Sequence, residues 1–389
     1  MIDRYCSPQM GLVWSPEHLF VLWAEVEVAV LSAQAQAGVI PAFWAQVAHQ
    51  TEAPSVDEVR EAERTHHHEM VAFLEAWGVP NVHLGVTSSD IQDLALLTQL
   101  EQANALVGEA LRRLDGELRD LIARSEDLPT TARTHGQQAQ AVRWAHLPTD
   151  HLVALRRAWA RWVVASEDLS AHAKLRGPTG NYAPPALTPE IESAVLEGLG
   201  FAPTDRATQV TPRDLMMYWA HALSAVTVVA ERIATQIRLD VQTGVGAAVL
   251  ARHGDGSSSM PHKTNPADAE QVCGLARVVR ALCGTLDVGV TGWGHRDLTN
   301  SSVERVVLPQ VTAYAEHLLD ALSGAVSRTM PLGTVPYTGD SAANLTAAMV
   351  NGLGYFSARA AVNQGYLGDL PTPVDWLDPL LARLGIETE

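Results

Sequence analysis

The chain has 389 residues, more than a single hydrophobic core usually accommodates, so we expect two or three domains. Its composition, 47% hydrophobic and 18% charged, excludes a disordered chain and a simple coiled coil. The formal net charge of -17 argues against nucleic acid and anionic membranes as partners, because a negative field repels polyphosphate.

Cysteine usage and the first residues indicate a cytoplasmic protein. Cys6, Cys273 and Cys283 are odd in number and lack metal-ligand spacing, so we expect free thiols in a reducing compartment. The N-terminus lacks the basic flank and apolar run of a signal peptide. The most apolar stretch, residues 220–230, is too short and too polar to span a bilayer.

The first half of the chain predicts short helices followed by one long helix. Residues 1 to about 88 favour shorter helices that end in a loop around Gly78, Pro80 and Gly85. Residues 90 to about 124 predict a long helix, with Ser89 and Gln92 as a capping box. Its apolar positions keep a three-four spacing: Leu97, Leu100, Val107, Leu111, Leu114, Leu118 and Leu121. A helix of roughly 50 Å needs other long helices to cover it.

Four later segments predict that cover. They are residues 135–171, interrupted by Pro148, residues 214–242, residues 266–286 and residues 301–326. Asn265 and Pro266 are a typical helix start, and Ser301 with Glu304 is a second capping box on a helix kinked by Pro309. We therefore expect an all-α protein with an N-terminal helical domain (1–88), a central long-helix bundle (89–330) and a short C-terminal helical domain (331–389).

The most distinctive motif is GSSSMPHKTNP, residues 256–266. A serine run by itself is more typical of a flexible linker. Lys263 and Asn265, however, directly precede a predicted helix N-terminus, and together they favour binding of a carboxylate. A nearby cation and helix dipole also favour the alkoxide of a serine, which suits that serine to act as a base.

Two further motifs place polar side chains at predicted helix starts. In TTARTHGQ, residues 130–137, His135 sits at an expected helix entry, where it suits proton transfer near neutral pH, although a lone histidine is more often structural. In HLGVTSSD, residues 83–90, the hydroxyls and free backbone N–H groups suit a second carboxylate. This second motif is also consistent with a helix cap alone.

The fourth motif, RDLTNSSVER, covers residues 296–305. Ser301 and Arg305 lie at i and i+4 on one helical face, and Arg296 approaches the same helix start. Two guanidinium groups with a helix N-terminus form a phosphate site in an otherwise acidic chain. A surface salt-bridge network is the equally plain alternative for this motif alone.

Together and in this order, the four motifs resemble the fumarase/aspartase superfamily. Further likeness lies in residues 4–14, 25–27, 38–41, 68–73 and 308–309, so that the resemblance extends to about residue 330. It implies the all-α, three-domain fumarase/aspartase-type fold and a homotetramer whose active sites are shared between three subunits. It also implies C–N bond cleavage by β-elimination, with fumarate released from a succinylated nucleotide, adenylosuccinate.

The resemblance also implies residue roles. Ser257 would remove the β-proton and His135 would protonate the departing amine. The succinyl carboxylates would be held by Thr87, Ser88, Lys263 and Asn265. The nucleotide phosphate would be held by Arg4, Tyr5, Arg296, Ser301 and Arg305. Substrate contact or support would come from His68, His83, Thr134, Gln209 and Glu270. Neither cofactor nor metal is expected, since the spacing of His66, His67 and His68 is poor for a metal.

Three departures from the superfamily pattern leave the substrate open. Position 67 is histidine where arginine is more usual, residues 138–141 lack the usual proline, and the segment after residue 330 is short. The alternatives are therefore a sister lyase acting on another N-substituted aspartate, such as argininosuccinate, and a non-catalytic helical tetramer. Retention of both proton-transfer residues disfavours the last.

Overall fold

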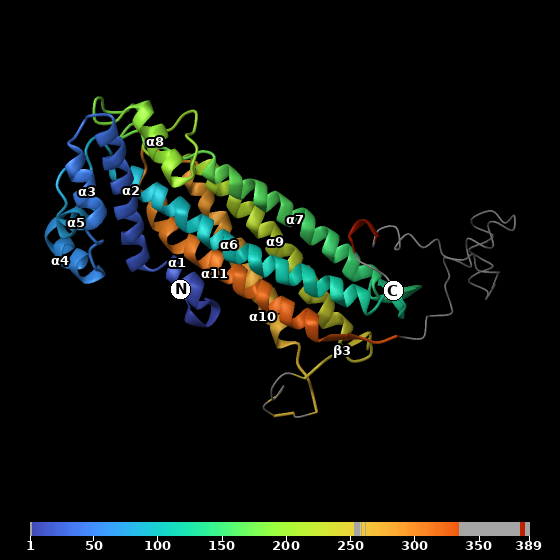
Figure 1. Ribbon diagram of the computed structural model, residues 1–389. Helices are drawn as coiled ribbons and strands as arrows, with labels where there is room; N and C mark the ends of the chain where they lie inside the picture. The colour runs from blue at the N-terminus through green and yellow to red at the C-terminus, as the bar shows by residue number, and fades with distance from the viewer. Residues whose placement is uncertain (1, 253–256, 258, 261, 334–381, 386–389) are drawn as a thin grey trace, which may run out of the picture. The chain divides into compact units, whose positions relative to one another are not determined.

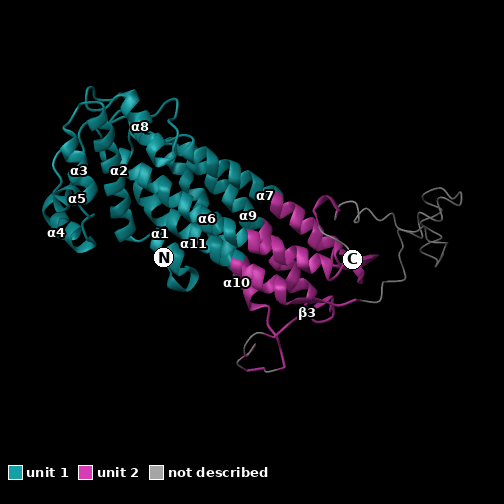
Figure 2. Cartoon of the chain, viewed as in Figure 1, with its two compact units in different colours: residues 1–111, 157–228, 274–319 teal, residues 112–156, 229–273, 320–389 magenta. Residues whose placement is uncertain are grey.

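The computed structural model describes residues 2–252, 257, 259–260, 262–333 and 382–385 (Figure 1). The chain divides into two compact units (Figure 2). Unit 1 comprises residues 1–111, 157–228 and 274–319, and unit 2 comprises residues 112–156, 229–273 and 320–389. Most of the predicted C-terminal domain, and residues 253–256, 258 and 261 of the serine loop, lie outside the described residues. The three-domain division stays a prediction.

The N-terminal part of unit 1 consists mostly of short helices, as expected, but α2, with 21 residues, is longer than predicted. The helices are η1 (Asp3–Tyr5), α1 (Pro8–Val13), α2 (Pro16–Gln36), α3 (Ala42–Gln50), α4 (Val56–His66) and α5 (Glu69–Trp77). Ser7, Ser15 and Ser55 cap α1, α2 and α4 by accepting backbone N–H groups, because the first N–H groups of a helix have no partner within it.

The core of these helices is aromatic. Phe20 and Trp23 of α2 pack on Phe73 of α5, with ring centroids 5.9 and 5.4 Å away. Helix α2 is long and apolar enough to cross a membrane, a feature that the sequence analysis missed. Because 56% of that apolar window is buried inside the fold, a core helix accounts for it equally well.

The long helices are α6 (Ser88–Ala123), α7 (His146–Ser170), α9 (Arg213–Asp240), α10 (Ala267–Cys283) and α11 (Thr299–Arg328). The shorter α8 (Pro189–Leu199) and η2 (Gly284–Gly289) complete the helical set of the described residues. The predicted apolar spacing of α6 is confirmed, since all seven of its members are buried, none more than 3% exposed. Pro309 lies inside α11, as predicted.

The predicted helix 135–171 is wrong over its first third. Residues Pro129–Thr134 (β1) and Gln137–Arg143 (β2) form an antiparallel hairpin, and α7 begins only at His146. Pro148 therefore falls in the first turn of α7, where backbone N–H groups have no helical partner and proline does not interrupt the helix. A second short antiparallel sheet consists of β3 (Ala248–Leu250) and β4 (Thr329–Pro331).

Both predicted capping boxes of the long helices are also wrong. Helix α6 begins at Ser88, and the carboxylate of Asp90 accepts the N–H of Thr87 at 2.9 Å, in place of a Ser89–Gln92 pair. Helix α11 begins at Thr299, whose N–H is accepted by Asp297 at 3.0 Å. Ser301 and Glu304 therefore lie within the helix.

Candidate active site

The residues predicted to form the site divide between the two units. Unit 1 carries Arg4, Tyr5, His68, His83, Thr87, Ser88, Gln209, Arg296, Ser301 and Arg305. Unit 2 carries Thr134, His135, Ser257, Lys263, Asn265 and Glu270. The predicted anion-binding residues of the nucleotide end thus belong to unit 1, and both predicted proton-transfer residues belong to unit 2.

His135 occupies the tip of the β1–β2 hairpin, so its predicted place at a helix entry is wrong. Thr134 pairs with Gln137, which leaves His135 and Gly136 as a two-residue loop. Both residues have positive φ, 53° and 74°, as in the type I′ turns that match the twist of a hairpin. The histidine side chain is exposed on a short rigid support, a position from which it can meet a ligand.

The serine loop ends in a turn before α10. The Oγ of Ser257 accepts the N–H of Met260 at 3.1 Å, and the N–H of Lys263 donates to the carbonyl of Met260 at 3.1 Å. Lys263 is exposed two residues ahead of Asn265, and α10 begins at Ala267. Glu270 is exposed on the first turn of that helix, with its N–H donating to the carbonyl of Pro266.

The loop that carries Thr87 and Ser88 is anchored by a buried carboxylate. Asp90 accepts hydrogen bonds from the Lys174 ammonium at 2.7 Å and from the N–H groups of Arg176 and Gly177 at 3.0 Å each. With the N–H of Thr87, four donors saturate its two oxygens. Asp90 and Lys174 are both fully buried, so this pair holds the start of α6 against the segment at 174–177.

A second carboxylate holds His83. Glu27 of α2, which is fully buried, accepts the ring Nδ1–H of His83 at 2.6 Å and its backbone N–H at 2.9 Å. His68, in contrast, caps α5, where its Nδ1 accepts the N–H of Val71 at 3.4 Å. Both histidines are therefore fixed locally by unit 1.

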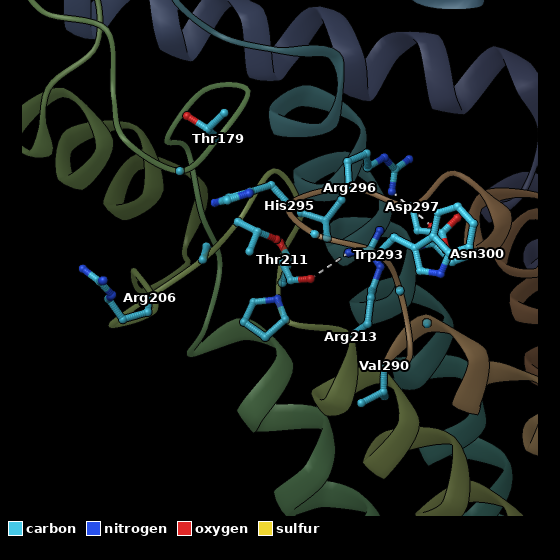
Figure 3. A pocket seen from close by; sticks show the side chains of 18 of the residues that line it. Thr179, Arg206, Thr211, Arg213, Val290, Trp293, His295, Arg296, Asp297 and Asn300 are labelled. Atoms are coloured by element: carbon cyan, nitrogen blue, oxygen red, sulfur yellow. Dashed lines mark hydrogen bonds between the residues drawn. The ribbon is translucent and has the colours of Figure 1, made fainter.

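Unit 1 contains a cavity of about 760 Å³ beside the start of α11 (Figure 3). Its lining includes Thr208, Trp293, His295 and the predicted phosphate ligand Arg296. The neighbouring Gln209 is held by three contacts. Its N–H donates to the carbonyl of His295 at 3.1 Å, its side-chain amide donates to that of Pro178 at 3.1 Å, and its own carbonyl accepts from Lys174.

Arg213, which lines this cavity, forms two buried ion pairs. Arg213 donates to Asp93 at 2.8 Å and to Glu304 at 2.8 Å. One of its N–H groups also donates to the carbonyl of Thr211 at 3.1 Å (Figure 3). Burial by itself would raise the pKa of Asp93, but Arg213 outweighs it and holds that pKa below its ordinary value. Burial likewise opposes the charge on Arg213, yet its two carboxylate partners raise its pKa.

Arg296 is linked to these ion pairs through the neutral side chain of Asn300. It donates to the amide oxygen of Asn300 at 3.1 Å (Figure 3). Asn300 in turn donates to Glu304 at 2.6 Å. Burial lowers the pKa of Arg296, because desolvation disfavours its charge. An anionic ligand in the cavity would offset that cost by stabilising the positive charge of Arg296.

The other predicted phosphate ligands occupy separate surroundings in unit 1. Arg305 forms an ion pair with Glu69 of α5. The ring of Tyr5 packs against Tyr314 and His317 of α11, with centroids 6.1 and 5.2 Å away. Arg4 is exposed, and Ser301 is half-buried in the first turns of α11. None of these four residues lines the cavity that holds Arg296.

Five buried charged residues near these positions were not predicted as part of the site from the sequence. Asp90, Asp93, Lys174 and Arg213 received no role, and Glu304 was assigned only a cap. One signal was available, because Asp90 and Asp93 lie at i and i+3 on the same face of α6 as buried residues. Among the described residues, no group of three or more His, Cys, Asp or Glu side chains is arranged to hold a metal ion.

The chain is similar to known lyases. Residues 19–281 match the family described as Lyase. The chain is 31% identical to adenylosuccinate lyase of Streptococcus mutans and 32% identical to adenylosuccinate lyase of Thermotoga maritima. Each match covers 84% of this chain and 77% of the relative.

Solved structures agree on the fold. The chain superposes on fumarate lyase from Mesorhizobium sp. BNC1 with a TM-score of 0.81 at 20% identity, covering 93% of this chain and 86% of that one. It superposes on 3-carboxy-cis,cis-muconate lactonizing enzyme from Pseudomonas putida with a TM-score of 0.79 at 24% identity, covering 92% and 85%. The predicted all-α fumarase/aspartase-type fold is confirmed.

Proposed function

Because the chain belongs to the lyase family that its residues 19–281 match, we propose that it cleaves the C–N bond of adenylosuccinate by β-elimination, releasing fumarate and AMP. One observation carries the proposal: relatives named adenylosuccinate lyase match at 30–32% identity over 82–84% of the chain. The matched length includes the hairpin histidine and the serine loop.

The chemistry assigned to these residues is a proton removal followed by departure of an amine. Ser257, as the alkoxide, takes the β-proton of the succinyl arm, and the electron pair of that C–H bond forms the new C=C bond. The C–N bond breaks, and the departing nitrogen takes a proton from His135. A carbanion beside a carboxylate carries extra negative charge, so Lys263, Asn265, Thr87 and Ser88 must already surround the carboxylates before reaction.

We propose a cytoplasmic homotetramer in which three subunits contribute to each site. In such a site Arg4, Tyr5, Arg296, Ser301 and Arg305 bind the nucleotide phosphate, His135 is the acid and Ser257 is the base. Gln209, His68, Thr134 and Glu270 contact or support the substrate.

The test is a fumarate-release assay with purified protein, following fumarate absorbance. Wild type should turn over adenylosuccinate, and Ser257→Ala or His135→Ala should lower kcat by about 10²- to 10⁴-fold, the usual loss of a general acid or base. Ser259→Ala and His49→Ala, at exposed positions without an assigned role, should keep wild-type rates. Absence of wild-type turnover at high enzyme concentration rejects the proposal.

A sister reaction on another N-substituted aspartate is favoured by one observation. Arg305 already forms an ion pair with Glu69, which competes with a substrate phosphate for its guanidinium. Arg296→Ala and Arg305→Ala separate the two substrates, because they should raise KM strongly only if the true substrate is phosphorylated. Argininosuccinate and aspartate belong in the same assay as alternative substrates.

A further inference from the structure

Helix α2 directs two buried polar side chains at the loop before α6. Glu27 and Gln34 lie seven residues apart, on one face of the helix, and both are fully buried. The amide of Gln34 donates to the carbonyls of Leu84 and Ala186 at 2.8 Å each. Glu27 binds His83, the residue before Leu84. This face of α2 therefore holds the loop both at its backbone and at one side chain.

A buried carboxylate is costly unless its charge is balanced and its oxygens are hydrogen-bonded. Among the described residues, both hydrogen bonds to the carboxylate of Glu27 come from His83, one from the ring and one from the backbone. His83 also has a φ of 61°, an uncommon conformation for a residue other than glycine. The carboxylate thus fixes the backbone and the ring of one residue together.

The arrangement leaves one ring nitrogen for a ligand. Glu27 accepts the proton on Nδ1, so Nε2 is the free end of the imidazole, and the His83 side chain is 21% exposed. His83 is four residues before Thr87, in the loop that supplies proposed carboxylate ligands. A substrate carboxylate at Nε2 would contact the ring at the end opposite Glu27.

We propose that Glu27 is a positioning residue for dicarboxylate binding, acting through His83, whose Nε2–H donates to a carboxylate of the succinyl arm. The proposal rests on the proposed function for the identity of that arm. Glu27 itself stays in the interior of α2 and touches no substrate. Its carboxylate fixes the orientation of the His83 ring, as second-layer carboxylates do for histidines that bind metals.

The decisive variant is Glu27→Gln, which preserves the size of the side chain but removes its charge. We expect KM for the substrate and the inhibition constant of fumarate to rise together by about tenfold, the loss of one charge-assisted hydrogen bond. The value of kcat should change less than about threefold, because proton transfer belongs to other residues. Glu25→Gln, an exposed neighbour on the same helix, is the matched control and should leave both constants unchanged.

A double-mutant cycle separates this role from a purely structural one. His83→Asn should match the KM effect of Glu27→Gln, and the double variant should be no worse than His83→Asn alone. Losses that multiply, or a kcat loss with unchanged KM, overturn the proposal. If Glu27→Gln fails to fold, Glu27→Asp, which keeps the charge, is measured in its place. This variant should keep most of the affinity of wild type for the substrate.

The role of Glu27 can be tested even if the protein does not cleave adenylosuccinate. Calorimetric titration with succinate measures dicarboxylate binding without turnover. If wild type binds succinate and Glu27→Gln binds it about tenfold more weakly, the role of Glu27 stands even where adenylosuccinate is not cleaved. If wild type cleaves adenylosuccinate and Glu27→Gln binds succinate equally well, only the role of Glu27 is rejected.

Discussion

Lys174 is a fully buried cation whose ammonium donates to Asp90 at 2.7 Å. Lys174→Met keeps the volume but leaves the Asp90 carboxylate buried without a cation. We expect the free energy of unfolding to fall by about 3–5 kcal/mol, the usual cost of breaking a buried pair from one side. Urea unfolding at pH 7 measures it. Asp57→Ala removes an exposed pair on α4 and should cost under about 0.5 kcal/mol. A similar cost for both variants contradicts the assignment.

Asp240, at the end of α9, gives the stability of unit 2 a pH dependence. Burial raises its pKa to about 6 from an ordinary value of 3.8, although Gln236 and Arg133 oppose that shift. Between these pH values the folded chain holds a proton that the unfolded chain has released, so stability falls as the pH rises through this window. Asp240→Asn abolishes the effect.

The melting temperature of Asp240→Asn should therefore match wild type near pH 4 and exceed it above pH 6.5. The corresponding difference in the free energy of unfolding is at most about 3 kcal/mol, since a shift of one pKa unit is worth about 1.4 kcal/mol. Asp120→Asn, at an exposed site of α6, is the control and should show no such trend. A difference between Asp240→Asn and wild type that is constant with pH would reject the shifted pKa.

At the scale of elements, the β1–β2 hairpin determines where His135 is held. Gly136 has a φ of 74°, and a Cβ there would meet no atom within 4 Å, so Gly136→Ala is penalised by backbone conformation alone. We expect a loss of about 1–2 kcal/mol in local hairpin stability and a lower kcat, because the turn that presents His135 is disturbed. Hydrogen exchange of the hairpin amides and fumarate release are the two measurements.

Gly116→Ala in α6 is the matched control for that substitution. Its Cβ also meets no atom within 4 Å, but its backbone is helical. Alanine should therefore stabilise the helix by about 0.5–1 kcal/mol and leave activity unchanged. Equal effects of the two glycine substitutions would show that the positive φ at Gly136 is unimportant.

At the scale of the whole molecule, exposed apolar side chains on the long helices of unit 1 suit burial between copies. Val164 of α7, Tyr218 and Val228 of α9 and Val306 of α11 are 58%, 61%, 46% and 54% exposed. We expect sedimentation to give a tetramer of the 41.9 kDa chain. Val228→Asp should dissociate it and abolish turnover while the helical circular dichroism persists. Phe43→Asp, at an exposed site of the short α3, should leave the assembly intact.

Shared sites predict recovery of activity on mixing inactive variants. When Ser257→Ala and His135→Ala chains are unfolded and refolded together in equal amounts, a site that takes its base and acid from different chains is intact about one time in four. Activity should return to about a quarter of wild type. If both residues come from one chain, the mixture stays inactive.

The amino-acid sequence determined most of the long helices and the buried seam of α6, because helical periodicity depends on residues that are close together in the chain. The hairpin at residues 129–143 was beyond such reasoning, since its strands are stabilised by pairing with each other.

Only the tertiary structure decided which charged residues are buried. Asp90 and Lys174 are 84 positions apart, and Arg213 meets Asp93 and Glu304 at separations of 120 and 91 positions. Each is of a residue type that usually lies in solvent, so composition favours the surface for all of them. The close approach of distant segments removes water from these groups. Their ion pairs are therefore stronger than pairs of the same residues would be in solvent.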